Sequence, residues 1–224
     1  MRKTLTVLIV AAFAAVGLLA GQLMAAFVPP ALPAGSQYQL LFVTADTTDA
    51  TSSDINDYNL MASYSASLNS MLPAATWQAI VSTPSVNAMT NAPWAGVPVY
   101  NTQGVLLSDA NGIYFFAGFS VAPVEFDQYG NTAPENWIWT GTNNDGNGVA
   151  GHELGTAIPV TGQSLINYQW LGNAVVDSAE TLHPIYAMSG PITAVPEPGG
   201  FVLSGSALFL YGAACRLKAR KRGS

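Results

Sequence analysis

The stretch that decides the fold is Tyr38-Gln39-Leu40-Leu41-Phe42-Val43-Thr44, in which apolar side chains occupy both alternating faces. A run this short and this apolar predicts a strand buried in the middle of a sheet. A helix is expected next, over 54–72. Ser53 can cap its first turn, Asp57 suits the positive end of its dipole, and Pro73 cannot continue it. The opening of the chain's central part therefore predicts a strand followed by a helix.

Further short apolar runs predict more strands, joined in the later half by loops rich in Gly, Asn and Thr. The expected strands cover 77–81, 97–100, 105–107, 113–116, 137–140 and 184–188. Asn101-Thr102-Gln103-Gly104 predicts a hairpin turn between two of them. We expect one α+β domain over 27–194, strand-rich, with one main helix and long loops. The only cysteine is Cys215, so this domain contains no disulfide.

The charged residues are segregated along the chain. All 7 basic residues lie in the two tails, none lies between Thr4 and Cys215, and all 13 acidic residues lie between Asp46 and Glu197. A body without cations cannot neutralise phosphates, which excludes nucleic-acid and nucleotide binding. Its acidic surface favours divalent cations, basic proteins or cationic polymers as partners. The basic tails predict segments retained on the cytoplasmic side of a membrane while the acidic body crosses it.

The first 26 residues have the layout of a secretory signal peptide. Arg2 and Lys3 precede the apolar run 5–20, and the small residues Ala25 and Ala26 follow. This order predicts export and cleavage after 1–26. The alternative is an uncleaved N-terminal anchor, and in both cases the residues that follow are exported.

The tail over 195–224 has three parts. Val195-Pro196-Glu197-Pro198 is followed by the apolar segment 199–215, whose 17 residues stand at the lower limit of about 17–25 for a spanning helix. The prolines favour an extended segment that a protease can grip. A basic cluster, which the positive-inside rule keeps in the cytoplasm, comprises Arg216, Lys218, Arg220, Lys221 and Arg222.

This three-part order resembles the PEP-CTERM sorting signal of Gram-negative bacteria, which is also labelled the ice-binding protein C-terminal domain without implying ice binding here. The resemblance covers about the last 30 residues. It implies recognition by a membrane-embedded exosortase and cleavage near Pro196-Glu197-Pro198. The precursor would lie in the inner membrane, and the body would then reach the cell surface or be secreted. Such systems accompany exopolysaccharide and biofilm matrix, so both exosortase and exopolysaccharide are implied partners.

The body resembles a second family in a series of short segments. They are Phe42-Val43-Thr44, Trp77-Gln78-Ala79-Ile80-Val81-Ser82, Pro98-Val99-Tyr100, Trp139-Thr140-Gly141-Thr142 and Ile185-Tyr186-Ala187-Met188-Ser189. Together they look like exported endostatin-like or C-type-lectin-like domains. The resemblance implies a mixed α+β fold with a long-loop face. Pro134-Glu135-Asn136-Trp137 departs from the calcium-dependent sugar-binding triplets of lectins, so that activity is not carried over.

Asn143-Asn144-Asp145-Gly146-Asn147-Gly148 is the best candidate for a metal site. Oxygen ligands on alternate residues suit calcium, and Asn143, Asp145 and Asn147 have that spacing. The EF-hand pattern fails because Leu154 stands at the twelfth position, and Asn-Gly and Asp-Gly pairs are also ordinary turn formers. A turn and a calcium loop both remain open. A second acidic patch, either a solvated loop with a helix cap or a calcium site, comprises Asp46, Asp49, Asp54 and Asp57.

Two segments resemble catalytic motifs only in part. Gly151-His152-Glu153-Leu154-Gly155-Thr156 lacks the second histidine that a zinc-protease helix requires. Gly118-Phe119-Ser120-Val121-Ala122 lacks the last glycine of a nucleophile elbow, and its base would have to be His152 or His183. Loop or core-edge positions account for both histidines.

Acidic and aromatic side chains leave one enzyme class open. Paired carboxylates could hydrolyse a glycoside, and the candidates are Glu125, Asp127, Glu135 and Glu153. The tryptophans are expected in the core rather than as sugar platforms, and they are Trp94, Trp137, Trp139 and Trp170. We therefore expect a non-enzymatic surface or matrix protein without a required cofactor, with a secreted polysaccharide hydrolase as the alternative.

Overall fold

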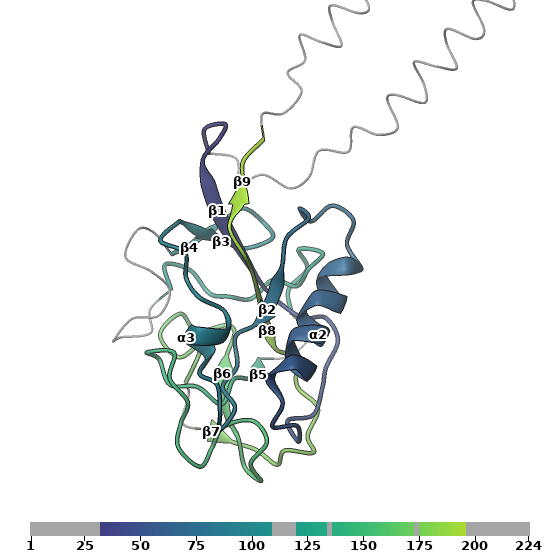
Figure 1. Cartoon of the computed structure of the whole chain (residues 1–224), viewed down its shortest axis with the longest axis vertical. Helices are drawn as coiled ribbons and strands as arrows, with labels where there is room; N and C mark the ends of the chain where they lie inside the picture. The colour runs from purple at the N-terminus through teal and green to yellow at the C-terminus, as the bar shows by residue number, and fades with distance from the viewer. Residues whose placement is uncertain (1–31, 109–119, 134–135, 173–174, 196–224) are drawn as a thin grey trace, which may run out of the picture.

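The computed structural model describes residues 32–108, 120–133, 136–172 and 175–195 (Figure 1). Within these ranges the chain is strand-rich and mixed α+β with one main helix, which confirms the expected fold class at that level. The elements in chain order are β1 (Gln37–Val43), α2 (Ile55–Ser67), β2 (Trp77–Ala79), α3 (Ala88–Asn91), β3 (Val99–Tyr100), β4 (Leu106–Ser108), β5 (Trp137–Trp139), β6 (Val160–Gln163), β7 (Val175–Val176), β8 (Tyr186–Ser189) and β9 (Ile192–Thr193).

A six-stranded sheet has β1 at its centre. Its strand order is β2-β8-β1-β3-β4, and β9 pairs with the beginning of β1. β1 runs parallel to β3 and antiparallel to β8, with Leu41 opposite Met188 and Gln39 opposite Val99. The apolar run that begins at Tyr38 is thus paired on both sides, which confirms the central strand predicted from it.

Both faces of β1 are buried. Tyr38, Leu40 and Phe42 point into the cluster beneath α2, where the Phe42 and Trp77 rings lie 5.1 Å apart. Leu41 and Val43 point into the opposite cluster. Side chains of a strand alternate between faces, so a strand covered on both faces needs an unbroken apolar run. This requirement explains why the sequence from Tyr38 to Val43 is nearly continuous in apolar residues.

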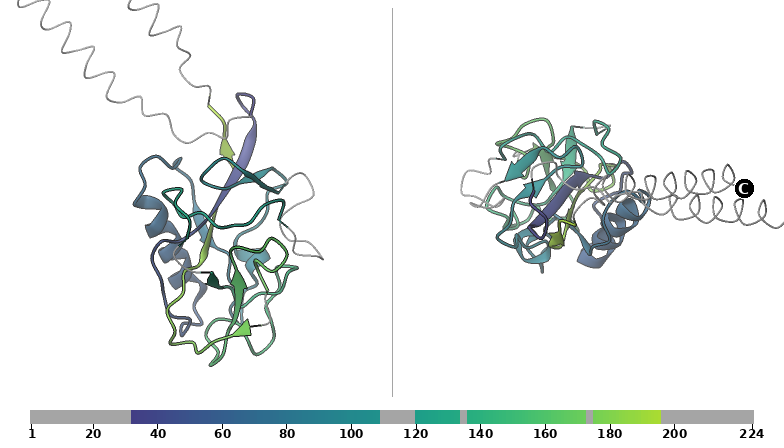
Figure 2. Two further views of the ribbon diagram at one scale, coloured as in Figure 1. Left: turned by 180° about the vertical axis from the view of Figure 1, so that it is seen from behind. Right: turned by 90° about the horizontal axis from the view of Figure 1, so that it is seen from above.

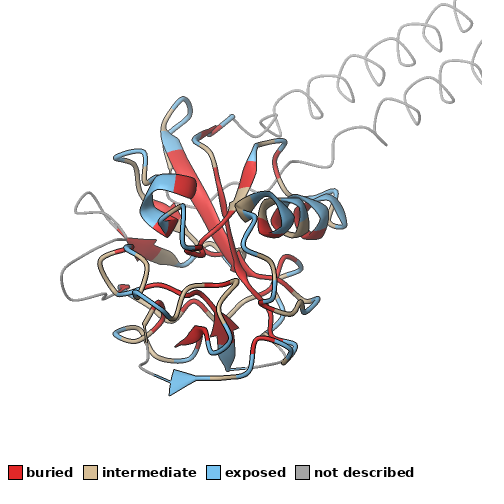
Figure 3. Cartoon of the chain, turned by 60° about the horizontal axis from the view of Figure 1, so that its bottom comes forward, coloured by how far each residue is buried: buried red, intermediate tan, exposed pale blue. Residues whose placement is uncertain are grey.

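α2 covers one face of the sheet at the edge strand β2. Tyr58, Ala62 and Ala66 are buried against the sheet, whereas Leu60 and Tyr64 on the outer side are exposed (Figure 3). This division follows from the period of the helix, which brings residues three and four apart to one side.

Side chains cap the outer edge of β2. Asn59 Oδ1 accepts the Ala79 amide at 2.9 Å, and Ser63 Oγ donates to the Trp77 carbonyl at 3.0 Å. The side-chain amide of Asn91 donates from Nδ2 to the Ala79 carbonyl at 2.8 Å. Because exposed strand edges recruit other strands, these bonds close the edge to strand addition.

A second, three-stranded antiparallel sheet has the order β5-β6-β7 and is joined by long turns. Ile138 of β5 lies opposite Gly162 of β6. A Cβ at Gly162 would overlap the carbonyl oxygen of Trp170, whose side chain is fully buried. The missing side chain therefore lets the Trp170 backbone pack directly on β6.

The two ends of the described body lie side by side. β9 pairs antiparallel with the first residues of β1, with Tyr38 opposite Ile192. The Gly35 amide donates to the Ala194 carbonyl, and the Ala194 amide donates to the Ser36 carbonyl, both at 2.8 Å. This pairing is at the end of the molecule opposite β7 (Figures 1 and 2).

The main helix differs from its predicted bounds at both ends. It begins at Ile55 with Asp54 rather than Ser53 as its cap, because Asp54 is extended and its carboxylate accepts the Asn56 amide at 3.0 Å. It ends at Ser67, well before Pro73. Asn69 ends it, because its side chain accepts the Met71 amide at 2.9 Å and donates to the Gln128 carbonyl at 2.6 Å.

Most predicted strands are present, with shifted bounds. The turn at 101–104 is confirmed: β3 and β4 pair antiparallel, the Gly104 amide donates to the Asn101 carbonyl at 3.0 Å, and Gly104 has φ +78°. The strand expected at 113–116 lies outside the described residues. The elements that the sequence did not predict are α3, β6, β7 and β9.

The hydrophobic tails are not part of the described structure. No helix within the described ranges is both long and apolar enough to cross a bilayer. The expected signal peptide, 1–26, and the expected spanning segment, 199–215, both lie outside those ranges.

Candidate functional site

The sorting motif follows immediately after the paired ends of the body. Ala194 is buried and bonded to the backbone before β1, whereas Val195, the last described residue, is 60% exposed. Pro196, Glu197 and Pro198 lie outside the described residues, as does the basic cluster from Arg216 to Arg222. The motif therefore begins directly after the last hydrogen-bonded residue of the domain, with no linker between them.

The structure brings Asn143, Asp145 and Asn147 together in one tight turn. The Asn143 amide donates to the Asn147 carbonyl at 2.7 Å, and Gly146 at the corner has φ +83°. The Asp145 carboxylate accepts the backbone amide and the side-chain amide of Asn147, each at 3.0 Å. These bonds account for the turn by short-range Asx contacts alone.

A contact that the sequence did not suggest ties this turn to α3. Asn87 donates from Nδ2 to Asn147 Oδ1 at 3.2 Å and accepts the Gly148 amide at 2.9 Å. The Met89 amide donates to the Gly146 carbonyl at 3.0 Å. Two of the three candidate calcium ligands, Asp145 and Asn147, thus already accept hydrogen bonds from the protein.

The second acidic patch is divided between the helix start and the preceding loop. Asp54 caps α2, and Asp57 accepts the Ser52 hydroxyl at 2.5 Å. Asp49 accepts the Thr51 hydroxyl at 2.6 Å and the Thr51 amide at 3.0 Å, and these bonds hold the pKa of Asp49 below its ordinary value. No group of three His, Cys, Asp or Glu side chains that could hold a metal occurs in the described ranges.

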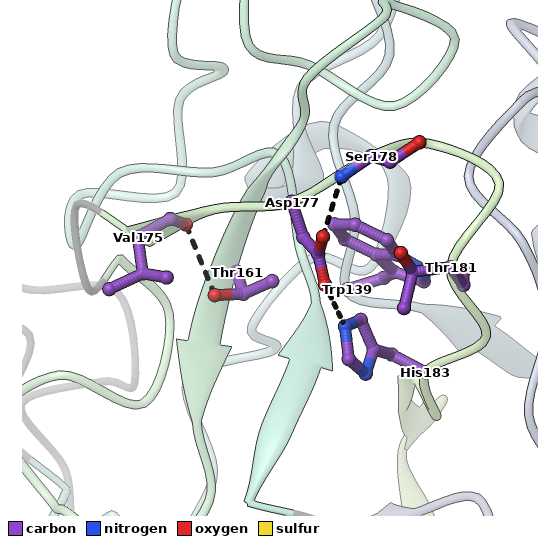
Figure 4. Close-up of polar contacts among 7 residues, drawn as sticks. All are labelled: Trp139, Thr161, Val175, Asp177, Ser178, Thr181 and His183. Carbon is purple, nitrogen blue, oxygen red and sulfur yellow. Dashed lines mark hydrogen bonds and ion pairs between the residues drawn. The ribbon is translucent and has the colours of Figure 1, made fainter.

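His183 forms a cluster with Asp177 and Trp139 where the two sheets meet (Figure 4). Its Nε2 lies 3.1 Å from Asp177 Oδ2, and its ring meets the Trp139 ring edge-on with centroids 4.7 Å apart. Trp139 Nε1 donates to the Thr181 carbonyl at 3.2 Å. His183 is 7% exposed, which agrees with the core-edge position expected for it.

The carboxylate of this cluster is held in its charged form. The hydrogen bond from His183 lowers the pKa of Asp177, and a second bond from the Ser178 amide at 2.7 Å acts in the same direction. Asp177 was not recognised in the sequence because it is joined to His183 by an irregular loop, where spacing carries no information about contact.

His152 and Glu153 lie in a turn rather than in a helix, so the partial zinc-protease motif does not form the helix that the complete motif requires. His152 Nδ1 lies 2.9 Å from the Ile158 carbonyl, and Glu153 accepts the Gly151 amide at 2.8 Å. Ser120 is buried, and its amide donates to the Asn167 carbonyl at 2.9 Å.

Two of the remaining carboxylate candidates, Asp127 and Glu125, lie in the described residues and differ in burial. Asp127 is buried, and its Oδ1 accepts the Tyr129 and Asn131 amides at 2.8 and 2.9 Å. Glu125 is half-buried, and Glu135 lies outside the described residues. Asp127 therefore stabilises the turn that follows it.

The tryptophans divide between core and surface. Trp139 and Trp170 are fully buried, and Trp94 packs against the second core cluster, as expected. The expectation is wrong for Trp137, which is 36% exposed, because it begins β5 at the margin of the small sheet.

Comparison with known proteins adds no family, since no family model and no curated protein matches the chain.

Proposed function

We propose that the chain is an exported precursor, processed by a membrane-embedded exosortase and displayed as a non-enzymatic cell-surface or matrix protein associated with exopolysaccharide. The single observation that carries this proposal is the segregation of charge: every basic residue lies in the tails and every acidic residue lies between Asp46 and Glu197. Cationic ends that stay in the cytoplasm and an anionic body that crosses the membrane account for that pattern.

The paired ends of the body support delivery at a membrane. Only three residues, Pro196 to Pro198, separate Val195 from Gly199, where the apolar segment begins, so the two are four residue steps apart. At 3.3–3.6 Å per extended residue, these span at most about 14 Å. The β1–β9 end of the domain would therefore face the membrane before cleavage, and the small sheet with its loops would face outward.

The fold within the α+β class is also part of the proposal. One main helix on a mixed sheet, with a small second sheet carrying long loops, supports a C-type-lectin-like domain. The carboxylates of Asp127, Asp145 and Glu153 are bonded to amides of their own turns. This use of acidic side chains supports a structural and binding role rather than hydrolysis.

The decisive experiment replaces the sorting motif by Pro196→Ala, Glu197→Ala and Pro198→Ala in the host. The unprocessed precursor is expected to accumulate in the inner membrane, because the extended segment for cleavage has been removed. Cell fractionation and mass spectrometry of both mature termini measure this outcome. Release of the body with unchanged termini would contradict the proposal.

A control variant combines Pro191→Ala with Glu180→Ala, which removes a proline and a carboxylate at exposed positions of the body. It should be processed as the natural sequence is. Accumulation of this control as well would mean that instability of the body, not loss of the motif, causes retention.

A further inference from the structure

An open groove of about 650 Å³ runs between the C-terminal half of α2 and the segment leading into β2. A smaller hollow of about 260 Å³ adjoins it, and Asn69 and Leu72 line both. The volume of the larger one falls in the range of about 300–1,000 Å³ that is common for small-molecule sites. The two adjoining hollows are here together called the α2 groove.

None of the residues that line the α2 groove is charged. Without an acidic group the groove offers no site for a cation, and without a basic group it offers none for an anion. An uncharged ligand fits its electrostatics.

The groove instead offers unused neutral hydrogen-bonding groups. The side chains of Ser70, Thr76 and Gln78 line it and bond to no other residue. Gln128 lines the smaller hollow, is fully buried and has no partner for its Nε2. Because that Nε2 is inaccessible to solvent, the hydrogen-bonding capacity that the groove offers to a ligand comes from Ser70, Thr76 and Gln78.

Each of the two hollows is lined by one aromatic ring. Tyr129 is half-exposed at the smaller hollow, and Trp77 lines the larger one while remaining mostly buried. Such rings combine an apolar face with a polar atom. Hydroxyl, amide and aromatic side chains in one lining match a ligand whose surface alternates C–H patches with hydroxyls.

An added peptide strand does not fit the groove. The outward amide and carbonyl of Ala79 are already bonded to Asn59 and Asn91, and the Trp77 carbonyl is bonded to Ser63. Strand addition depends on free main-chain groups at a sheet edge. The occupant must therefore bind through side chains.

We propose that the α2 groove binds a segment of an uncharged saccharide. The inference rests on the proposed association with exopolysaccharide and names the chemical class of polymer and the surface that holds it. It places this site on α2 rather than on the loops that carry the candidate calcium ligands.

The test uses the full chain purified in a detergent without a sugar head group, with Ala74→Trp and Ala150→Trp variants. Ala74 is exposed and lines the groove, whereas Ala150 is exposed in the turn region outside it. The probes are neutral hexasaccharides of glucose, mannose and galactose, compared with hexamers of galacturonic acid and of glucosamine. Calorimetric titration measures binding, and near-ultraviolet circular dichroism checks folding.

Saturable binding of a neutral hexasaccharide is expected, weakened by more than about tenfold in Ala74→Trp because the indole fills the groove, and unchanged in Ala150→Trp. Tyr129→Ala should weaken binding about three- to tenfold, with the exposed Tyr64→Ala on the outer side of α2 as its control. Unweakened binding by folded Ala74→Trp overturns the proposal. So does the absence of neutral binding, or equal binding of the charged hexamers.

These outcomes are separable from failure of the proposed export. Correctly processed termini in the host, together with no neutral binding by the natural sequence, would overturn the groove and leave delivery intact. An unprocessed precursor that still binds neutral hexasaccharides would retain the groove and overturn the delivery route.

Discussion

The six-stranded sheet under α2 and the loop region over 120–133, 136–172 and 175–183 are held together by different means. In the sheet, apolar side chains fill both faces of β1. In the loop region, buried hydroxyls bond to the backbone: Thr140 Oγ1 donates to the Leu171 carbonyl and Thr142 Oγ1 to the Thr140 carbonyl, each at 2.6 Å. Because the body contains no Lys or Arg, its loops are held by hydrogen bonds of hydroxyl and amide groups and by close backbone packing.

Close packing of backbone predicts the largest effect in the loop region. Gly162→Ala would drive a Cβ into the Trp170 carbonyl, and that oxygen belongs to backbone that cannot rotate away. A loss of stability of about 3 kcal/mol or more is expected from this overlap. Thermal unfolding of the full chain, followed by tryptophan fluorescence, measures it.

Gly151→Ala is the matched control for this substitution. Gly151 has φ +81°, and a Cβ added there would meet open space, so the cost of the substitution is limited to backbone strain of about 1 kcal/mol. Equal losses in both variants would show that conformation, rather than packing against Trp170, fixes glycine in this region.

The same contrast explains what could be predicted from sequence. β1 and α2 were predictable because a continuous apolar run and a 3.6-residue period are local patterns. β6 was not, because Thr161-Gly162-Gln163 has no apolar run and its Gly162 serves a packing contact with the Trp170 backbone that no local pattern reveals. β7 and β9 are too short to carry any period.

The candidate site follows the same rule. Asn143, Asp145 and Asn147 were found because alternation is local, whereas the Asn87 contact with their turn joins distant segments. The α2 groove could not be found in sequence, because its lining comes from α2, the segment before β2 and the turn at Gln128. Its members are ordinary Ser, Asn and Gln residues, and only folding makes them neighbours.

The capped edge of β2 provides the next largest effect, now within the six-stranded sheet. Asn59→Ala removes the acceptor of the Ala79 amide and a partner of Asn91. The free energy of unfolding should fall by about 2 kcal/mol, because buried polar groups lose their partners. The exposed Asn147→Ala in the turn is the comparison and should cost less than about 1 kcal/mol. A larger loss for Asn147→Ala would mean that the turn, rather than the sheet edge, is the more cooperative part.

The smallest expected effect concerns Asp177, at the border of the two regions. Its pKa is lower in the folded protein, so its carboxylate stabilises the fold above the ordinary aspartate value of about 3.9, and that contribution is lost as the pH falls through the folded value. Because its side chain is 43% exposed, the contribution should not exceed about 1 kcal/mol. Asp177→Asn should therefore reduce the loss of thermal stability between pH 5 and pH 3.

Asp49→Asn should act in the same direction, and the two changes should add because they remove separate hydrogen bonds. An unchanged pH dependence in Asp177→Asn would show that the bond to His183 orients the loop without favouring the charged carboxylate.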